Sequence, residues 1–90
     1  MISRTYTIRN KLGLHARPSA QLTQTASRFQ SEVFLAKDSR RVNAKSIMGV
    51  MMLAAGTGSV LTVEASGPDE AQAVDAVGAL IDSGFGEAAG

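Results

Sequence analysis

Four short segments of the chain have the alternating apolar and polar residues, or the β-prone composition, of strands: 2–8, 32–37, 40–43 and 60–65. In the first, Ile2, Tyr6 and Ile8 share one face, which Arg4 interrupts. Asp38-Ser39 separates the second segment from the third, and this residue pair is typical of a hairpin turn. The pattern predicts strands that each turn one face to a core.

Three other segments place apolar residues at helical spacing: about 16–28, about two turns after Ser46, and a stretch that Gly67-Pro68-Asp69-Glu70 starts and that ends before Gly84. Pro18 is compatible with the first helix only in its opening turn, where the missing N–H would have no partner. The resulting order is β-α-β-β-α-β-α. One apolar face per element predicts an α+β fold, with three helices on one face of a four-stranded, largely antiparallel sheet.

Length and charge narrow the class of protein. Ninety residues, 44% of them apolar and 19% charged, predict a single globular domain over residues 1–90. Nine Lys+Arg against eight Asp+Glu give a net charge of +1, so we expect neither nucleic acid nor a membrane surface as partner. Residues 1–6 lack the apolar run of a signal peptide, and no segment has the ~20 apolar residues of a membrane span. We therefore expect a cytoplasmic protein without membrane insertion.

The residue inventory excludes several kinds of site. The chain has no cysteine and one histidine, so disulfides, thiolate metal sites and histidine clusters for zinc are ruled out. Gly56-Thr57-Gly58 lacks the lysine and the following helix of a nucleotide-binding loop. Asp69 and Glu70 begin a helix, where adjacent acids usually interact with the helix dipole. We expect neither a cofactor nor a metal.

The single histidine lies where an anion would be favoured. In Gly13-Leu14-His15-Ala16-Arg17-Pro18, His15 precedes a helix whose first N–H groups, those of Ala16 and Arg17, have no intrahelical acceptor. The helix dipole and the Arg17 guanidinium add positive charge, and imidazole is a competent nucleophile when neutral. A phosphoryl group is the natural ligand, although a lone histidine is more often only a structural helix cap.

Specific strings then point to a family. Gly13-Leu14-His15-Ala16-Arg17-Pro18 resembles the active-site signature of HPr, the histidine-containing phosphocarrier family of the phosphoenolpyruvate-dependent phosphotransferase system (PTS). Residues 43–51 resemble its regulatory serine segment, and residues 67–71 resemble the start of its last helix. The resemblance covers nearly the whole chain. It implies an open-faced β-sandwich, in agreement with the element order.

The resemblance implies a relay and not an enzyme. His15 would accept a phosphoryl group from phospho-enzyme I on Nδ1, not on Nε2, and pass it to IIA proteins or domains. Arg17 and the backbone N–H of Ala16 would stabilise the phosphoryl group. No acidic residue in the motif is paired in sequence with His15, which predicts a carrier whose partners complete the transfer site.

Ser46 and the residues after it have two interpretations each. Ser46 is a helix N-cap, and the family resemblance adds phosphorylation by an HPr kinase/phosphorylase. Val50 and Leu53 are predicted to be core, whereas Ile47, Met48 and Met51 are predicted to form a docking patch with Lys45 and Arg17 as its basic rim. Lys37 and the Arg40-Arg41 pair are predicted to be a solvated hairpin edge.

Two alternatives stay open at this point. The nitrogen-branch, NPr-like proteins resemble the chain in the His15 segment, although the string from Ser46 to Val50 favours the sugar-transport type. A regulatory binding module would use the Ser46 segment without relaying phosphate. Because a carrier that moves between two large proteins works best alone, we expect a monomer.

Overall fold

The computed structural model describes residues 1–87 and contains one four-stranded sheet. All strand pairs are antiparallel, and the strands lie in the order β1-β4-β2-β3. β1 at the edge pairs with β4, so the first and the last strand of the chain lie side by side. The strand bounds are β1 Ile2–Thr7, β2 Glu32–Lys37, β3 Arg40–Asn43 and β4 Val60–Ser66.

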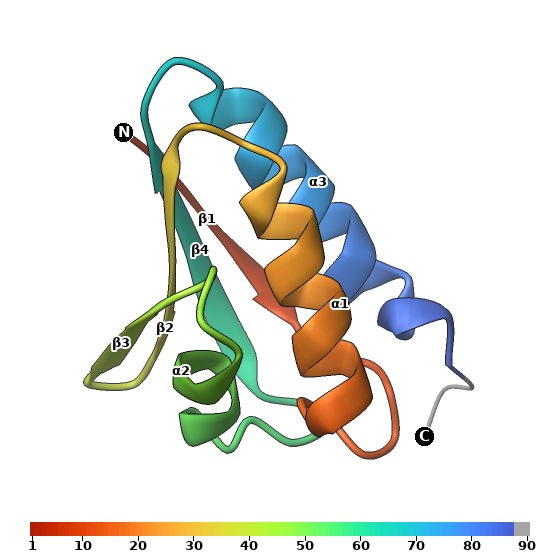
Figure 1. The fold of residues 1–90 in the computed structure, drawn as a ribbon. Helices are drawn as coiled ribbons and strands as arrows, with labels where there is room; N and C mark the ends of the chain where they lie inside the picture. Colours follow the sequence, from red (N-terminus) through yellow and green to blue (C-terminus); the bar gives the residue numbers. More distant parts are fainter. Residues whose placement is uncertain (88–90) are drawn as a thin grey trace.

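Three helices and one short 3₁₀ turn complete the fold: α1 Ala16–Ser27, α2 Ile47–Met52, α3 Glu70–Asp82 and η1 Gly84–Gly86. Figure 1 shows α1 and α3 side by side over one face of the sheet, with α2 near the start of α1. The predicted class and the order β-α-β-β-α-β-α are confirmed. The turn η1 was not predicted, because it is built from backbone angles and not from apolar periodicity.

The core lies between the sheet and the helices. In β4 the alternation is complete, with Leu61, Val63 and Ala65 buried and their neighbours more exposed. The two longer helices contribute one buried stripe each: Leu22 and Ala26 from α1, and Val74, Val77 and Ile81 from α3. Burial of a large aliphatic side chain contributes roughly 1.5–3 kcal/mol, so this layer dominates the stability of the fold.

Arg4, which interrupts the apolar face of β1, has a partner on a helix. Its guanidinium donates a hydrogen bond to Asp75 of α3 at 2.8 Å, and both side chains are more than half exposed. The arginine therefore reaches along the edge of the covered face to solvent. A charge on the core side of an edge strand is tolerated here because it never enters the core.

The helix starts follow their sequence signals. Pro18 lies in the first turn of α1, which begins at Ala16. Ser46 is the N-cap of α2, and its Oγ accepts a hydrogen bond from the Gly49 N–H at 3.2 Å. Val50 and Leu53 are buried, as predicted. None of the helices among residues 1–87 has the length and apolar content needed to cross a membrane.

Candidate functional site

His15 stands at the N-cap of α1 with an extended backbone and a side chain that is 36% exposed. The preceding loop is a set of tight turns: the Gly13 N–H donates to the Asn10 carbonyl at 3.2 Å, and the His15 N–H donates to the Gly13 carbonyl at 3.0 Å. Gly13 has φ +67°, and a Cβ there would collide with the Ala55 carbonyl. Only glycine fits this close approach, which fixes the loop and thus the histidine.

The backbone beside His15 offers free donors. The His15 carbonyl accepts the helical hydrogen bond from the Ser19 N–H at 3.0 Å, which marks the true start of α1. Within residues 1–87 no acceptor is found for the N–H groups of Ala16 and Arg17. The Arg17 side chain is exposed and, in the same part of the chain, makes no ion pair. These groups form an open, positively polarised mouth suited to an oxyanion.

The structure places one carboxylate against the histidine, although no acid lies beside His15 in the sequence motif. The Glu87 oxygens Oε1 and Oε2 lie 3.3 Å and 3.2 Å from His15 Nε2. Glu87 is 72 residues away in the chain, and its side chain is only 21% exposed. Sequence reasoning missed this contact because it searched the neighbourhood of the histidine, whereas the fold brings the partner from the far end.

The turn η1 carries Glu87 to this position. Gly84, Phe85 and Gly86 all have positive φ, at 68°, 59° and 74°. Phe85 is 3% exposed, so its ring anchors the turn in the core, and the Glu87 N–H donates to the Gly84 carbonyl at 2.9 Å. Two glycines around a single aromatic residue were the sequence signal for an anchored turn. They gave no sign of where Glu87 would point.

Asn10 is the second residue of this site that sequence reasoning missed. The side chain is fully buried, and its Nδ2 donates to the Gly13 carbonyl at 2.8 Å and to Glu87 Oε1 at 3.1 Å. One amide thus ties the loop before His15 to the carboxylate that contacts the ring. Thr57 fastens the same loop from the other side by donating to the Asn10 carbonyl.

The residues after Ser46 form an exposed apolar surface. Ser46 is itself exposed. The exposed fractions are 39% for Ile47, 68% for Met48 and 40% for Met51. Met52 is also exposed, at 61%, as is Leu12 in the loop before His15, at 68%. Figure 1 shows α2 and the start of α1 at the same end of the molecule. We call Ile47, Met48, Met51 and Met52 the α2 patch.

The two cations expected to rim this surface do not meet. Arg17 lies in the first turn of α1, whereas the Lys45 ammonium donates a hydrogen bond to the Phe29 carbonyl, just beyond the last turn of the same helix, at 2.8 Å. Lysine near a helix C-terminus is stabilised by the dipole and by the unpaired carbonyls. Lys45 therefore has a structural role as well as the docking role predicted for it.

Comparison with known proteins identifies the family. A model of the family described as "PTS HPr component phosphorylation site" matches residues 2–83. The chain belongs to the HPr family. It is a phosphocarrier of the PTS phosphorelay, a relay protein and not a catalytic enzyme, and membership implies enzyme I and IIA partners.

Individual HPr proteins are similar over nearly the full length. The phosphocarrier protein HPr of Cupriavidus necator is 61% identical over 87 residues, which are 97% of this chain and 98% of that protein. The HPr-like protein Crh of Bacillus subtilis is 48% identical over 81 residues, 90% of this chain and 95% of Crh. The crystal structure of HPr-C-His from Thermoanaerobacter tengcongensis has 50% identity and a TM-score of 0.94, covering 98% of this chain and 99% of that one.

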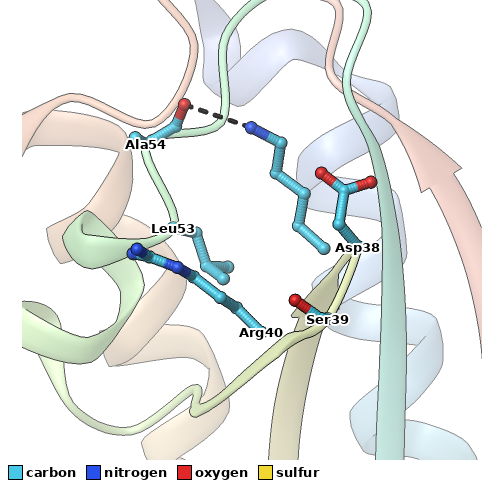
Figure 2. Close-up of a pocket in the computed structure, with 6 residues that line it drawn as sticks. Asp38, Ser39, Arg40, Leu53 and Ala54 are labelled. Atoms are coloured by element: carbon cyan, nitrogen blue, oxygen red, sulfur yellow. Dashed lines mark hydrogen bonds between the residues drawn. The ribbon is translucent and has the colours of Figure 1, made fainter.

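A second polar region of this HPr lies at the β2–β3 hairpin. A hollow of about 280 Å³ lies there, and its lining residues are Lys37, Asp38, Ser39, Arg40, Leu53 and Ala54. Figure 2 shows this region in close-up. Both cations contact carbonyls at the end of α2: Lys37 Nζ lies 3.4 Å from the Ala54 oxygen, and Arg40 donates to the Met52 carbonyl at 2.9 Å. The predicted solvated edge thus also caps a helix.

Asp69 and Glu70 of this HPr bind backbone and hydroxyl groups. Asp69 accepts from Ser31 Oγ and from the N–H groups of Gln30 and Ser31, and these bonds hold the pKa of its carboxyl below the ordinary value. The Gly67 N–H, and then the amino terminus, lower the pKa of Glu70. The prediction that both acids serve the dipole was incomplete: Asp69 is the N-cap residue of α3, but its side chain makes no capping hydrogen bond.

Proposed function

We propose that His15 is the phosphoryl acceptor of this HPr and that Nδ1 is the atom phosphorylated. The observation that carries the proposal is the partly exposed imidazole at the start of α1, next in the chain to the unpartnered N–H groups of Ala16 and Arg17. In the transfer, the Nδ1 lone pair forms a bond to phosphorus as the bond to the donor atom of phospho-enzyme I breaks. The donor atom keeps the electron pair, and the reverse step passes the group to a IIA protein or domain.

The surroundings of His15 suit a phosphoryl group that must leave again. The two N–H groups and the Arg17 guanidinium stabilise the dianion by charge and hydrogen bonding. All of them lie at an open surface, so the phosphoryl group stays accessible and is bound only moderately. A buried, fully satisfied phosphate would be a poor donor, because stabilisation of the bound state slows the next transfer.

We further propose the α2 patch, with Arg17, as the docking surface for enzyme I and IIA. Four apolar side chains on one short helix are exposed and lie outside the core, which is typical of a docking surface. Methionine adapts to more than one partner shape. A carrier that binds two different proteins in turn requires such adaptability. The Lys45 ammonium donates a hydrogen bond to the Phe29 carbonyl, and its positive charge is a further contribution to this region.

Regulation at Ser46 is the second proposed function, and the exposed hydroxyl beside the α2 patch favours it. An HPr kinase/phosphorylase would add a dianion at the N-terminus of α2, next to Ile47 and Met48. The charge would disfavour docking of apolar or acidic partner surfaces there. The phosphorylated or unphosphorylated form would also act as a regulatory binding module without relaying phosphate.

The proposed carrier is a single-domain monomer of the cytoplasm, with neither a cofactor nor nucleic acid as partner. The extent of the family match and the single sheet support one domain. The near-neutral charge supports protein partners over polyanions.

The decisive experiment measures intact mass after incubation with phosphoenolpyruvate, Mg²⁺ and enzyme I. Wild type is expected to gain one phosphoryl group that acid removes, and folded His15→Ala is expected to gain none. Circular dichroism checks that the variant is folded. Unchanged phosphorylation of His15→Ala, or an acid-stable product, would overturn the assignment.

A further inference from the structure

The contact between Glu87 and His15 Nε2 has a direct chemical consequence for which ring nitrogen reacts. We propose that Glu87 is a positioning residue that directs the phosphoryl group to Nδ1. The inference rests on the proposed function, since it assumes that His15 accepts the group. Its grounds are the distances of 3.2 Å and 3.3 Å from Nε2 to the two carboxylate oxygens.

A carboxylate at one ring nitrogen fixes the tautomer. Ionised Glu87 is only an acceptor, so Nε2 must carry the proton that it donates. In neutral imidazole the other nitrogen then holds the lone pair. Nδ1 is thus the nucleophile, and Nε2 is both protonated and covered by negative charge that repels an incoming phosphoryl group.

The same carboxylate stabilises the product of the transfer. When Nδ1 bonds to phosphorus, its lone pair is used and the ring, which still carries the Nε2 proton, becomes positively charged. Glu87 balances that charge at Nε2, the ring nitrogen that does not carry the phosphoryl group, and Arg17 and the free N–H groups at the start of α1 are available to the dianion. No proton has to enter or leave in the step.

Glu87 is held in place independently of the histidine. Asn10 Nδ2 donates to Oε1 at 3.1 Å, Asn10 is fully buried, and the buried Phe85 anchors the turn that precedes Glu87. Orienting partners of this kind fix the ring orientation and the tautomer of histidines that react or bind metals. A freely rotating surface glutamate would not do so.

The experiment compares wild type with Glu87→Ala and Glu87→Gln, and uses Asp82→Ala as control. Asp82 is an exposed acid at the end of α3 that lies near Arg9 and has no contact with His15, so its loss changes net charge equally. Two quantities are measured: the ¹⁵N shifts of both His15 ring nitrogens with the ring neutral, without enzyme I, and the rate of phosphorylation by phospho-enzyme I.

In Glu87→Ala the two ring shifts are expected to move toward each other, and phosphorylation to slow about tenfold, the typical weight of one charge-assisted hydrogen bond. The amide oxygen of Glu87→Gln still accepts a hydrogen bond from Nε2. Relative to Glu87→Ala, this variant should therefore recover part of the difference between the two ring shifts and a smaller part of the phosphorylation rate. Asp82→Ala should match wild type in both.

Three results would overturn the inference: wild-type shifts and rate in Glu87→Ala, the same losses in Asp82→Ala, or a glutamine variant no different from alanine in both readouts. In each case phosphorylated wild type would leave the proposed function intact. If wild-type His15 accepted no phosphoryl group, the proposed function would fail, and the role of Glu87 in transfer with it, whatever the shifts showed.

Discussion

At the scale of single residues, Arg17 is the side chain nearest in sequence to His15 that can contact a phosphoryl group without holding it tightly. Replacing it by alanine removes one exposed charge, and we expect phosphorylation by phospho-enzyme I to slow by roughly tenfold without being abolished, because the two N–H groups remain. Arg28→Ala, which removes an exposed arginine beyond the other end of α1, is the control. Rapid-quench transfer assays measure both. Equal slowing in the two variants would contradict a local role for Arg17.

Ser46 allows charge and helix capping to be separated. Asparagine and aspartate cap a helix about as well as serine, so Ser46→Asn and Ser46→Asp should both keep the fold. Only aspartate adds negative charge beside the α2 patch, and we expect it alone to weaken docking of enzyme I and slow transfer. Ser46→Ala should lower the free energy of unfolding by about 1 kcal/mol through loss of the bond to Gly49. Phosphoryl transfer by Ser46→Asp at the wild-type rate would contradict the regulatory proposal.

The same scale shows what a sequence discloses about a site. His15, Ala16 and Arg17 could be identified because adjacent residues at a helix start act together, and their chemistry is local. Glu87 and Asn10 could not, since their roles depend on a contact across 77 residues between a turn with three positive φ values and a buried asparagine. Neither apolar periodicity nor charge pattern indicates a contact between residues so far apart in the sequence.

At the scale of elements, α3 crosses β1 so closely that Gly78 lies against the Tyr6 ring. A Cβ at residue 78 would overlap the ring atoms of Tyr6. Gly78→Ala should therefore destabilise the protein by about 1–3 kcal/mol despite the better helix propensity of alanine, because a packed interface must open.

Gly56→Ala is the matched control for this prediction. Gly56 has no positive φ, and nothing lies within 4 Å of a Cβ built there, so the substitution should be neutral or slightly stabilising. Urea denaturation of both variants provides the measurement. A Gly78→Ala protein as stable as Gly56→Ala would show that α3 moves away from the sheet at little cost.

Elements were predictable where periodicity carries them. The first and last strands and the three helices follow from apolar spacing, the two middle strands follow from β-prone composition around a turn, and Ser46 and Pro18 mark two helix starts. The turn η1 was not predicted, because its one buried aromatic residue lies between glycines and the segment is too short to show an apolar period. The position of the Lys45 side chain was not predicted either, because its hydrogen bond to the Phe29 carbonyl depends on how the loop before α2 packs on the end of α1.

At the scale of the whole molecule, acids at the start of α3 join segments that are far apart in the chain. Asp69 binds Ser31, which is 1% exposed and follows α1, and Glu70 pairs with the amino terminus at 3.1 Å. The sequence predicted two acids that interact with the helix dipole, whereas in the fold they also connect the last helix to the beginning and the middle of the chain. Stability should consequently depend on their ionisation.

The sign of that dependence follows from the lowered pKa values. The hydroxyl of Ser31 and the Gln30 N–H lower the pKa of Asp69 below 3.8, and the Gly67 N–H lowers that of Glu70 below 4.5. Groups whose pKa is lower in the folded state stabilise it fully above their unfolded values, and this contribution is lost as pH falls through the folded values. We expect the urea midpoint to be insensitive to these two groups above pH 5 and to fall with acidification below about pH 4.

Asp69→Asn tests the assignment. The variant cannot ionise at this position, so it should be less stable than wild type at neutral pH, and the difference should shrink as the pH falls below about 4. Asp38→Asn is the control, because it removes the same charge from an exposed turn residue with φ +54°, a conformation that asparagine accepts. Urea midpoints are compared at neutral pH and at several points below pH 4. A constant difference between Asp69→Asn and wild type across this range would show that the carboxylate contributes by shape and not by its charge.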